Sequence, residues 1–224
     1  MTSPLLVFDL DGTLIDTAPD LVDTLNVVFA REGLAPVPFE TARTYIGTGA
    51  RTMIARGAEA EGRDLPPAKL DQMFGDFLKH YGEHVADRSR PFPGLTDALD
   101  ELAAAGHRFA VCTNKLERLS LLLLDALALS HRFEAICGAD TFEMHKPDPE
   151  VLRRTIKAAG GNPQRAIMIG DSATDIRTAR AAGVPVIAVD FGYTERPVAE
   201  FEPDHIISHF AQLPAAVAAL APAD

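Results

Sequence analysis

The sequence predicts a doubly wound α/β fold, in which helices cover both faces of a parallel sheet and an all-helical segment is inserted after the first strand. Short, almost wholly apolar runs recur along the 224 residues and end in polar groups, as the central strands of parallel sheets do. Stretches with helical spacing of apolar residues separate these runs, which is typical of βαβ units with right-handed crossovers. The alternation breaks once, over a long early stretch without a strand-like run.

The first strand is expected over residues 5–8, and the later strands share its short apolar character. These later runs cover residues 109–112, 135–137, 166–169 and 186–189. Between them, apolar side chains three or four positions apart mark one face of each helix. The stripes are Leu95, Leu99 and Leu102; Leu119, Leu122, Leu123 and Leu127; and Ile176, Ala179 and Ala182. The alanine-rich stretch after Pro214 predicts a closing helix, and the pattern as a whole is that of a Rossmann-like sheet.

The stretch that breaks the alternation covers residues 16–90 and is predicted to be an all-helical domain, whereas residues 1–15 and 91–224 form the α/β core. Thr17 is followed by a proline in the first turn and by an acid three residues on, which is typical of a capped helix start. Gly33 fits the end of this helix.

Three further helical stretches are expected in the insertion. One covers residues 39–46, and the next follows Gly47-Thr48-Gly49. The last carries an apolar stripe, which consists of Phe74, Phe77, Leu78 and Tyr81. Two prolines and a glycine at residues 91–94 mark the return of the chain to the sheet.

Composition and charge exclude several classes of protein. The chain has 32 acidic and 21 basic residues and a net charge of −11, so a broad cationic face for nucleic acid or anionic lipid is not expected. The N-terminus has no signal-peptide pattern, and no apolar run approaches the roughly 20 residues of a membrane span. Cys112 and Cys137 lack metal or redox spacing and indicate half-buried, reduced thiols. We expect a cytoplasmic protein, monomeric or homodimeric, without nucleic-acid or membrane partners.

Two aspartates directly after the first predicted strand are the strongest functional signal. Asp9 and Asp11 stand in the order Asp-Leu-Asp-Gly-Thr, and the two-residue period of an extended chain points both side chains the same way. They lie at the carboxyl end of a strand, where open α/β sheets bind ligands. A plain turn would also use Asp and Gly, but a second acidic motif downstream argues for a site.

That second motif, Gly-Asp-Ser-Ala-Thr-Asp, follows the predicted strand 166–169 and opens a helix. It places Asp171 and Asp175 at the carboxyl end of another strand. A helix cap would account for one aspartate but not for two.

Two further positions gain meaning as members of this set. Thr113 ends the strand 109–112 and is followed by Asn114, and Lys146 begins the rigid Lys-Pro-Asp-Pro loop before a helix. Four carboxylates against one lysine leave surplus negative charge, and a phosphate substrate would add more. Because the ligands are oxygens without His or Cys, the sequence favours Mg²⁺ over Zn²⁺ as the cofactor.

The ordered set of Asp-x-Asp-Gly-Thr, Thr113, Lys146 and Gly-Asp-Ser-x-x-Asp resembles the haloacid dehalogenase-like hydrolases over essentially the whole chain. The helical insertion is similar to the cap of that family. Residues 8–21, 45–50 and 112–115 are most similar to bacterial phosphoglycolate phosphatases.

The resemblance implies roles for the motif residues. Asp9 would be the nucleophile that forms an aspartyl-phosphate, and Asp11 would act as general acid and then general base. Mg²⁺ would be held by the carboxylate of Asp9, the backbone carbonyl of Asp11 and Asp171, with Asp175 behind them. Lys146 would assist catalysis, and Gly12, Thr113 and Asn114 would contact the phosphoryl group.

The resemblance implies a small phosphorylated metabolite as substrate, with 2-phosphoglycolate foremost. A sugar phosphate, a nucleotide or pyrophosphate remains an alternative, as do a β-phosphoglucomutase-like phosphotransferase and a signalling module that is phosphorylated without turnover. Asp11 argues against a true dehalogenase or a phosphonatase, because both lack this second aspartate.

The insertion also supplies candidate substrate contacts and a candidate motion. It is expected to hinge near Asp16 and Arg90 and to close over the strand ends. The loop Gly47, Thr48 and Gly49 and the following Arg51 suit a small carboxylate, because a helix start and a guanidinium both bind anions. A solvated surface arginine is the competing interpretation.

Two histidine pairs carry weaker signals. His80 and His84, and likewise His205 and His209, are four residues apart, but a third zinc ligand is lacking for both. Ile206 and Ile207 between the second pair indicate an edge strand.

Overall fold

Six parallel strands form the central sheet of the computed structural model, which describes residues 3–221. Their spatial order is β5-β4-β1-β6-β7-β8. The strands are β1 (Leu5–Phe8), β4 (Arg108–Cys112), β5 (Phe133–Cys137), β6 (Ala166–Gly170), β7 (Val186–Val189) and β8 (His205–Ile207). All five predicted strands are confirmed, and the isoleucine pair near the C-terminus forms the edge strand β8. The predicted doubly wound α/β fold is correct.

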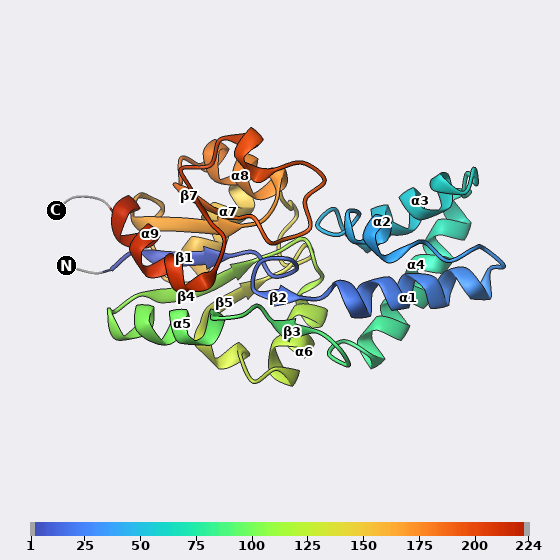
Figure 1. The fold of residues 1–224 in the computed structure, drawn as a ribbon, viewed down its shortest axis with the longest axis horizontal. Helices are drawn as coiled ribbons and strands as arrows, with labels where there is room; N and C mark the ends of the chain where they lie inside the picture. Colours follow the sequence, from blue (N-terminus) through green and yellow to red (C-terminus); the bar gives the residue numbers. More distant parts are fainter. Residues whose placement is uncertain (1–2, 222–224) are drawn as a thin grey trace.

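Helices cover both faces of the sheet (Figure 1), because side chains alternate along each strand. Leu6 and Phe8 of β1 belong to one core cluster, and Leu5 and Val7 belong to the other. The first cluster contains buried residues of α5 (Leu95–Ala104), α6 (Glu117–Ala126) and α9 (Leu213–Leu220), and the second contains those of α7 (Pro149–Ala158) and α8 (Ala173–Ala182). Strands buried on both faces explain the continuous apolar runs of the sequence.

Short 3₁₀ turns complete the α/β part of the chain. They are η1 (Ser130–Arg132), η2 (Pro163–Arg165), η3 (Val198–Phe201) and η4 (Phe210–Gln212). Two details of the prediction are wrong. Leu122 does not belong to the buried stripe of α6, since it is 38% exposed, and both cysteines are buried rather than half-buried.

A segment of four helices lies beyond the end of the sheet to which the β1 arrow points (Figure 1). It consists of α1 (Ala18–Arg31), α2 (Phe39–Arg43), α3 (Ala50–Ala60) and α4 (Pro67–Glu83). The chain enters it through β2 (Ile15–Asp16) and leaves it through β3 (Arg90–Pro91), and these short strands pair antiparallel. Asp16 is opposite Arg90 in that pair, so entry and exit run side by side.

The helix predicted over residues 39–46 is shorter than expected. It ends at Arg43, and the backbone N–H groups of Thr44, Tyr45 and Ile46 each donate to the carbonyl three residues earlier. These tighter turns replace the α-helical pattern before Gly47, whose φ of 95° turns the chain toward α3.

The start of α1 also differs from its predicted capping pattern. Thr17 occupies the N-cap position, but its hydroxyl donates to Asp11 Oδ1 at 2.8 Å instead of accepting from the helix. Asp20 turns away from the helix end and accepts bonds from the segment before β3. The donors are the backbone N–H groups of Arg88 and Ser89 and the Ser89 hydroxyl, at 2.6–3.1 Å. Asp20 thus joins the entry of the four-helix segment to its exit.

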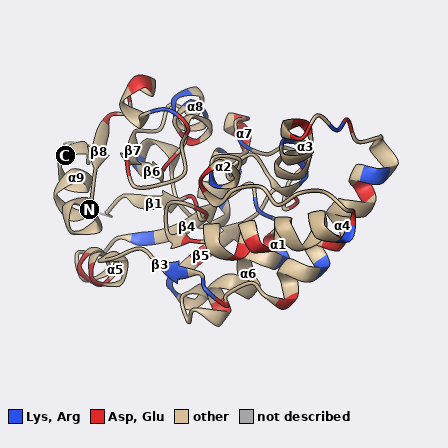
Figure 2. Cartoon of the chain, turned by 45° about the vertical axis from the view of Figure 1, so that its right-hand side comes forward, with Lys and Arg blue, Asp and Glu red and all other residues tan. Residues whose placement is uncertain are grey.

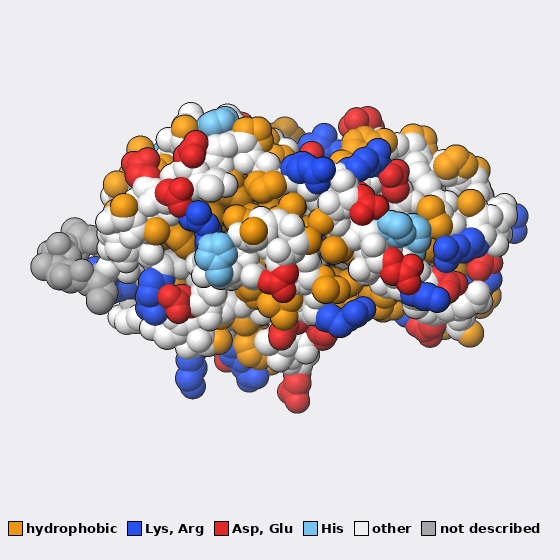
Figure 3. Space-filling view, turned by 90° about the horizontal axis from the view of Figure 1, so that it is seen from below, with side chains coloured by type: hydrophobic (Ala, Val, Ile, Leu, Met, Phe, Trp, Pro, Cys, Tyr) orange, Lys and Arg blue, Asp and Glu red, His pale blue; other side chains and the backbone are white. Residues whose placement is uncertain are grey.

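Charged side chains are distributed over both parts of the molecule (Figure 2). On the face shown in Figure 3, acidic and basic side chains lie among hydrophobic ones. None of the helices within residues 3–221 has the length and apolar character needed to cross a bilayer.

The buried contacts of Asp20 predict a large loss of stability in Asp20→Ala. The variant leaves the buried N–H and hydroxyl donors of Ser89 and the partly buried N–H of Arg88 without an acceptor, which costs about 1–3 kcal/mol. Asp23→Ala on the same helix is the matched control, because Asp23 forms only an exposed ion pair with Arg88, and such pairs contribute about 0–1 kcal/mol. Urea unfolding measures both, and equal small losses would contradict the role of Asp20.

Candidate active site

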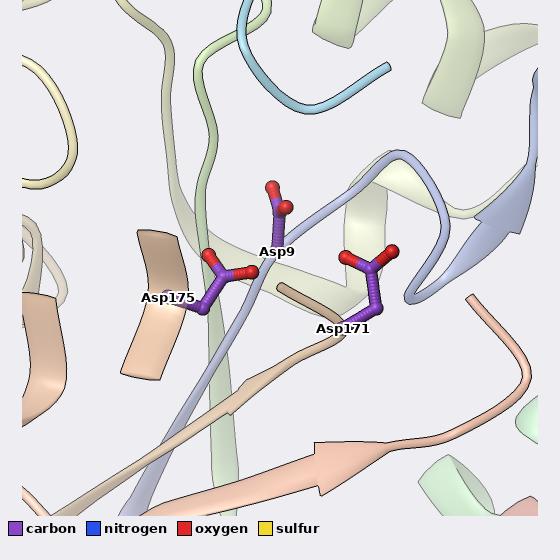
Figure 4. Close-up of side chains that lie close together, drawn as sticks. All are labelled: Asp9, Asp171 and Asp175. Carbon is purple, nitrogen blue, oxygen red and sulfur yellow. The ribbon is translucent and has the colours of Figure 1, made fainter. Parts of the chain in front are cut away.

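Three buried carboxylates converge at the carboxyl ends of β1 and β6 (Figure 4). Asp9 directly follows β1, Asp171 directly follows β6, and Asp175 lies in the first turn of α8. Each offers one oxygen, and these oxygens lie within 4.8 Å of one another. The parallel pairing of β1 with β6 brings together two motifs that are far apart in the sequence.

Lys146 provides the positive charge among these carboxylates. Its Nζ lies 2.9 Å from Asp9 Oδ1 and 2.6 Å from Asp175 Oδ1. Burial alone would lower the pKa of Lys146, but the carboxylates of Asp175 and Asp9 raise it above its ordinary value. Asn114 fixes the lysine from the side, since its amide accepts from the Lys146 N–H at 3.0 Å and donates to the Lys146 carbonyl at 3.2 Å.

The three carboxylates outnumber this lysine, and the pKa values of Asp171 and Asp9 are raised. Burial, with Asp175 and Asp9 close by, raises the pKa of Asp171 to about 8. Burial also raises the pKa of Asp9 to about 6, although Lys146 opposes that shift. A divalent cation would offset the surplus charge, and an all-oxygen donor set suits a hard cation. The residues present therefore fit a divalent metal ion.

Asp171 is oriented by groups that touch both of its oxygens. Thr13 Oγ1 donates to Oδ1 at 3.2 Å, and the Tyr193 backbone N–H donates to Oδ2 at 2.8 Å. Gly12 and Gly192 leave room for this carboxylate, because a Cβ on either would lie within 2.4 Å of an Asp171 side-chain atom. Gly12, predicted as a substrate contact, packs here against Asp171.

Asp175 combines two structural tasks. Its Oδ1 binds Lys146, and its Oδ2 accepts from the N–H of Ser172 at 3.1 Å and from the Ser172 hydroxyl at 2.6 Å. The Ser172 hydroxyl in turn accepts from the Asp175 N–H, which completes a capping box at the start of α8. Both oxygens of Asp175 are thus engaged, and its charge holds the lysine in place.

Asp11 lies apart from the three-carboxylate group and faces different partners. Its Oδ1 accepts from the Thr17 hydroxyl and from Lys115 Nζ, each at 2.8 Å. The side chain is 12% exposed, so it is more accessible than Asp9 at 5%. The two aspartates of the first motif therefore occupy distinct environments, although the sequence places them two residues apart.

A cavity of about 470 Å³ lies between these strand ends and the four-helix segment. Its lining contains nine of the twelve residues that the sequence marks as candidates. These are Asp9, Asp11, Gly47, Thr48, Gly49, Arg51, Thr113, Asn114 and Lys146. The other three, Gly12, Asp171 and Asp175, are not among its lining residues. Apolar side chains of α4 and α6, including Phe77 and Leu119, line much of the remaining wall.

The candidate substrate contacts on the helical segment have different partners in the structure. Gly47 accepts a hydrogen bond from the Asn114 amide through its carbonyl at 3.4 Å, so its loop touches the α/β part. Thr48 donates its hydroxyl to the Tyr45 carbonyl. Arg51 forms an ion pair with Asp71 of α4, and its side chain is 45% exposed. The guanidinium thus has a carboxylate partner of its own.

Several further contacts hold the four-helix segment to the loop after β7. Arg43 of α2 donates to the carbonyls of Phe191 and Gly192, and its guanidinium lies 5.2 Å from the centre of the Tyr193 ring. The Tyr193 hydroxyl donates to Asp16 at 2.5 Å and accepts from the Ala18 N–H at 3.0 Å. Tyr193 therefore connects Asp171 with the entry of the helical segment.

The histidine pairs do not extend this site. The rings of His80 and His84 lie 4.5 Å apart, and His84 bonds to Asp87. Burial and the neighbouring His84 lower the pKa of His80. His209 accepts from the Ala211 N–H. Among residues 3–221, the acidic cluster at the strand ends is the group with metal-binding geometry.

The sequence did not single out Lys115, Tyr81 or Tyr193 as site residues. Lys115 follows Thr113 by two positions, and its side chain is 5% exposed. Its Nζ lies 4.4 Å from the centre of the Tyr81 ring of α4. Lys115 lies three residues after the end of β4 and two after the predicted Thr113, and this place in the loop that follows a strand end is the signal that marks it.

The chain is similar to a known protein family and to named relatives. The family model for Haloacid dehalogenase-like hydrolase matches residues 6–189. The chain is 52% identical over 210 residues to the phosphoglycolate phosphatase of Mesorhizobium japonicum, with 94% of this chain and 92% of the relative covered. It is 49% identical over 211 residues to the phosphoglycolate phosphatase of Agrobacterium fabrum, with 94% and 91% covered.

Among solved structures, the chain is similar to a predicted phosphoglycolate phosphatase from Haemophilus somnus 129PT. The TM-score is 0.86 at 28% sequence identity, and the match covers 96% of this chain and 98% of that one. The resemblance inferred from the motifs is therefore confirmed.

The raised pKa of Asp171 predicts that binding of Mg²⁺ at pH 7 releases about one proton, because the cation requires the ionised carboxylate. Calorimetry in buffers of different ionisation enthalpy measures this proton, and at pH 9 the release should approach zero. Without a cation, the contribution of Asp171 to the free energy of unfolding should fall as pH rises from 3.8 to about 8, because this group then holds its proton in the folded chain but not in the unfolded chain.

The matched control is Asp171→Asn, which should lose both the binding and the proton release. Cation binding without proton release at pH 7 would show that Asp171 is already ionised and would contradict this account of the charge balance.

Proposed function

The chain belongs to the haloacid dehalogenase-like hydrolases and is a phosphatase; we propose that it hydrolyses 2-phosphoglycolate to glycolate and phosphate through an aspartyl-phosphate on Asp9. The observation that carries the mechanism is the contrast between Asp9, buried beside Lys146, and Asp11, which faces the cavity with other partners. The substrate is supported by the relatives named phosphoglycolate phosphatase, at 52% and 49% identity over most of the chain.

Asp9 is placed to act as the nucleophile. Its Oδ1 accepts from the Leu10 N–H at 2.7 Å and from Lys146 at 2.9 Å. Its Oδ2 accepts no hydrogen bond from any residue in the described range 3–221, and Asp9 lines the cavity. One oxygen is thus held while the other is available to a phosphorus atom.

The proposed reaction has two steps that balance through Asp11. In the first, Asp9 Oδ2 bonds to phosphorus, the bond from phosphorus to the leaving oxygen breaks, and protonated Asp11 gives its proton to that oxygen. In the second, water attacks phosphorus, Asp11 takes a proton from the water, and the bond between Asp9 and phosphorus breaks to release phosphate. Asp11 returns to its protonated form after each turnover.

The remaining polar groups bind and orient the phosphoryl group. Thr113 and Lys146 line the cavity beside Asp9 and offer a hydroxyl and an ammonium. Asn114 positions Lys146 through its two backbone bonds. Asp9 and Asp171 would hold Mg²⁺, with Asp175 supporting Lys146 behind them. When bound, Mg²⁺ supplies charge neutralisation for the phosphoryl oxygens.

We propose that residues 16–90 form a cap that closes over the site, with residues 1–15 and 91–224 as the α/β core. The antiparallel pair β2–β3 makes the two crossings adjacent, as a hinge requires. The cavity lining from both parts, including Gly49 and Thr113, supports closure around the substrate.

A second candidate is a larger phosphomonoester. The observation in its favour is the cavity itself, because its volume of about 470 Å³ is larger than a two-carbon acid fills. Its partly apolar wall also suits a larger substrate. The experiment that separates the candidates is Mg²⁺-dependent phosphate release measured over a panel of 2-phosphoglycolate, sugar phosphates, nucleotides and pyrophosphate. A highest kcat/KM for 2-phosphoglycolate supports the proposal. Transfer of phosphate between sugars would indicate a mutase, and phosphorylation without turnover would indicate a signalling module.

Asp9→Asn should reduce phosphate release to the background of the assay, because the amide is a poor nucleophile. The fold should remain, since Asn keeps the shape of Asp9 and removes a carboxylate whose ionisation burial disfavours. Steady-state turnover and urea unfolding measure the two effects. Asp125→Asn, the same change on an exposed position of α6, is the control with full activity. Undiminished turnover in folded Asp9→Asn would rule out the covalent route.

Asp11→Asn should affect esters according to their leaving groups. Alkyl phosphates, whose leaving oxygen needs a proton, should lose about 10²–10⁴-fold in kcat. Activated aryl phosphates should lose much less in the first step, because their leaving oxygen is stable as an anion. Single-turnover kinetics measure that step for both esters, and an equal loss would argue against Asp11 as the general acid.

A further inference from the structure

Lys115 is a buried cation for which the proposed mechanism has no task. Its Nζ contacts Asp11 Oδ1 at 2.8 Å and faces the Tyr81 ring at 4.4 Å. Both Lys115 and Tyr81 line the cavity. The 2.8 Å contact with the Asp11 carboxylate stabilises the charged form of Lys115. The ammonium is therefore charged at the wall of the cavity.

The polar groups at this wall are not saturated by the protein. An ammonium has three N–H donors; Lys115 directs one at Asp11 Oδ1 and one toward the Tyr81 side chain, which leaves one without an acceptor among residues 3–221. The Tyr81 hydroxyl is buried beside this ammonium, and its O–H has no acceptor within the same described range. Buried polar groups are nearly always hydrogen-bonded. Free donors beside a cavity thus indicate that a ligand with acceptor atoms completes them.

The other cations of the cavity are already paired. Lys146 lies between Asp9 and Asp175, both within 2.9 Å. Arg51 is paired with Asp71 at a largely exposed position. Lys115, by contrast, shares its one carboxylate with the Thr17 hydroxyl. Lys146, which has a third N–H donor, is assigned to the phosphoryl group, so among the described residues of the cavity wall Lys115 is the buried cation left for a second anionic group.

The position of Lys115 matches the shape of 2-phosphoglycolate. The ester oxygen must come within hydrogen-bond reach of Asp11 to receive its proton, and a single methylene separates that oxygen from the carboxyl carbon. The carboxylate therefore arrives beside the groups that contact Asp11, of which Lys115 is the cation and the one that lines the cavity. A cation adjacent to the general acid meets the charged end of a short 2-phosphoryl acid but not that of a long ester.

We propose that Lys115, supported by the Tyr81 hydroxyl, binds the carboxylate of the substrate and makes the enzyme specific for short phosphoryl esters of hydroxy acids. This inference rests on the proposed function. It assigns to Lys115 the carboxylate contact that the sequence suggested for Arg51. Lys115 is then a specificity-determining residue that touches the substrate, and its contact with Asp11 orders the ammonium before the substrate enters.

The test compares 2-phosphoglycolate with 2-phosphoglycolamide, which replaces the carboxylate by a neutral carboxamide of the same shape. The wild-type protein should prefer the acid by about ten- to a hundredfold in kcat/KM, the effect of one hydrogen bond to a charged group. In Lys115→Met that preference should disappear, while Lys115→Arg should retain much of it. Lys79→Met, the same change on an exposed position of α4 outside the cavity lining, is the matched control and should leave the preference unchanged.

A second variant tests the inference without altering Lys115. Asp11→Asn replaces the carboxylate that Lys115 contacts in the ligand-free protein by a neutral amide, so 2-phosphoglycolate should bind more tightly relative to 2-phosphoglycolamide when calorimetry measures affinity. This arm decides the matter even where Lys115→Met does not fold. An unchanged affinity ratio in Asp11→Asn overturns the inference.

The outcomes separate this inference from the proposed function. A wild type that prefers the acid, combined with equal losses for both esters in Lys115→Met, overturns the role of Lys115 and leaves the function standing. A selective loss in Arg51→Met instead of Lys115→Met does the same. A wild type that prefers the amide refutes both 2-phosphoglycolate as the substrate and the carboxylate contact. Selective loss of the acid ester in Lys115→Met alone supports the inference.

Discussion

Three buried carboxylates, two of which contact one buried ammonium, are the constraint on which the rest of the structure depends. Removing several charges from water costs several kcal/mol per ion unless partners compensate, and Lys146 compensates only part of the negative charge. The strand ends must therefore hold the carboxylates at fixed positions. Gly170 and Gly192 make this possible, because a Cβ on either would lie within 2.4 Å of a side-chain atom of Asp175 or Asp171. Gly170 of the second motif and Gly192 of the loop after β7 thus leave room for the packed carboxylates.

The sheet and the helical segment contribute differently to the site. Asp9, Asp171 and Lys146 come from strand ends and loops of the α/β part, where backbone pairing leaves little freedom. The helical segment adds Tyr81 and the loop around Gly47, which cover the cavity. Under the proposed function, this division places the phosphoryl chemistry on the α/β part and the recognition of the remaining substrate at the boundary between the two parts. Small changes in the helical segment can therefore alter specificity while the acidic centre is kept.

Much of this arrangement could be predicted from the sequence, because its signals are local. The apolar runs identify the strands, since a strand buried on both faces needs apolar side chains throughout. Asp9 and Asp171 could be predicted as site residues because each directly follows the end of a strand. Lys115, Tyr81 and Tyr193 could not be derived this way, because their partners are tertiary: Lys115 and Asp11 are separated by 104 positions. The pairing of Arg51 with Asp71 could not be predicted either, because the two residues are 20 positions apart and lie on different helices.

The central claim is that the surplus negative charge at the strand ends holds a metal ion and leaves Asp9 as the group that takes the phosphoryl. A crystal structure of the protein grown with Mg²⁺ and beryllium fluoride, a mimic of a phosphoryl group on aspartate, tests it most directly. The account predicts beryllium bonded to the free oxygen of Asp9, with Mg²⁺ in contact with Asp9 and Asp171. Beryllium on another aspartate, or Mg²⁺ bound away from the three carboxylates, would contradict it.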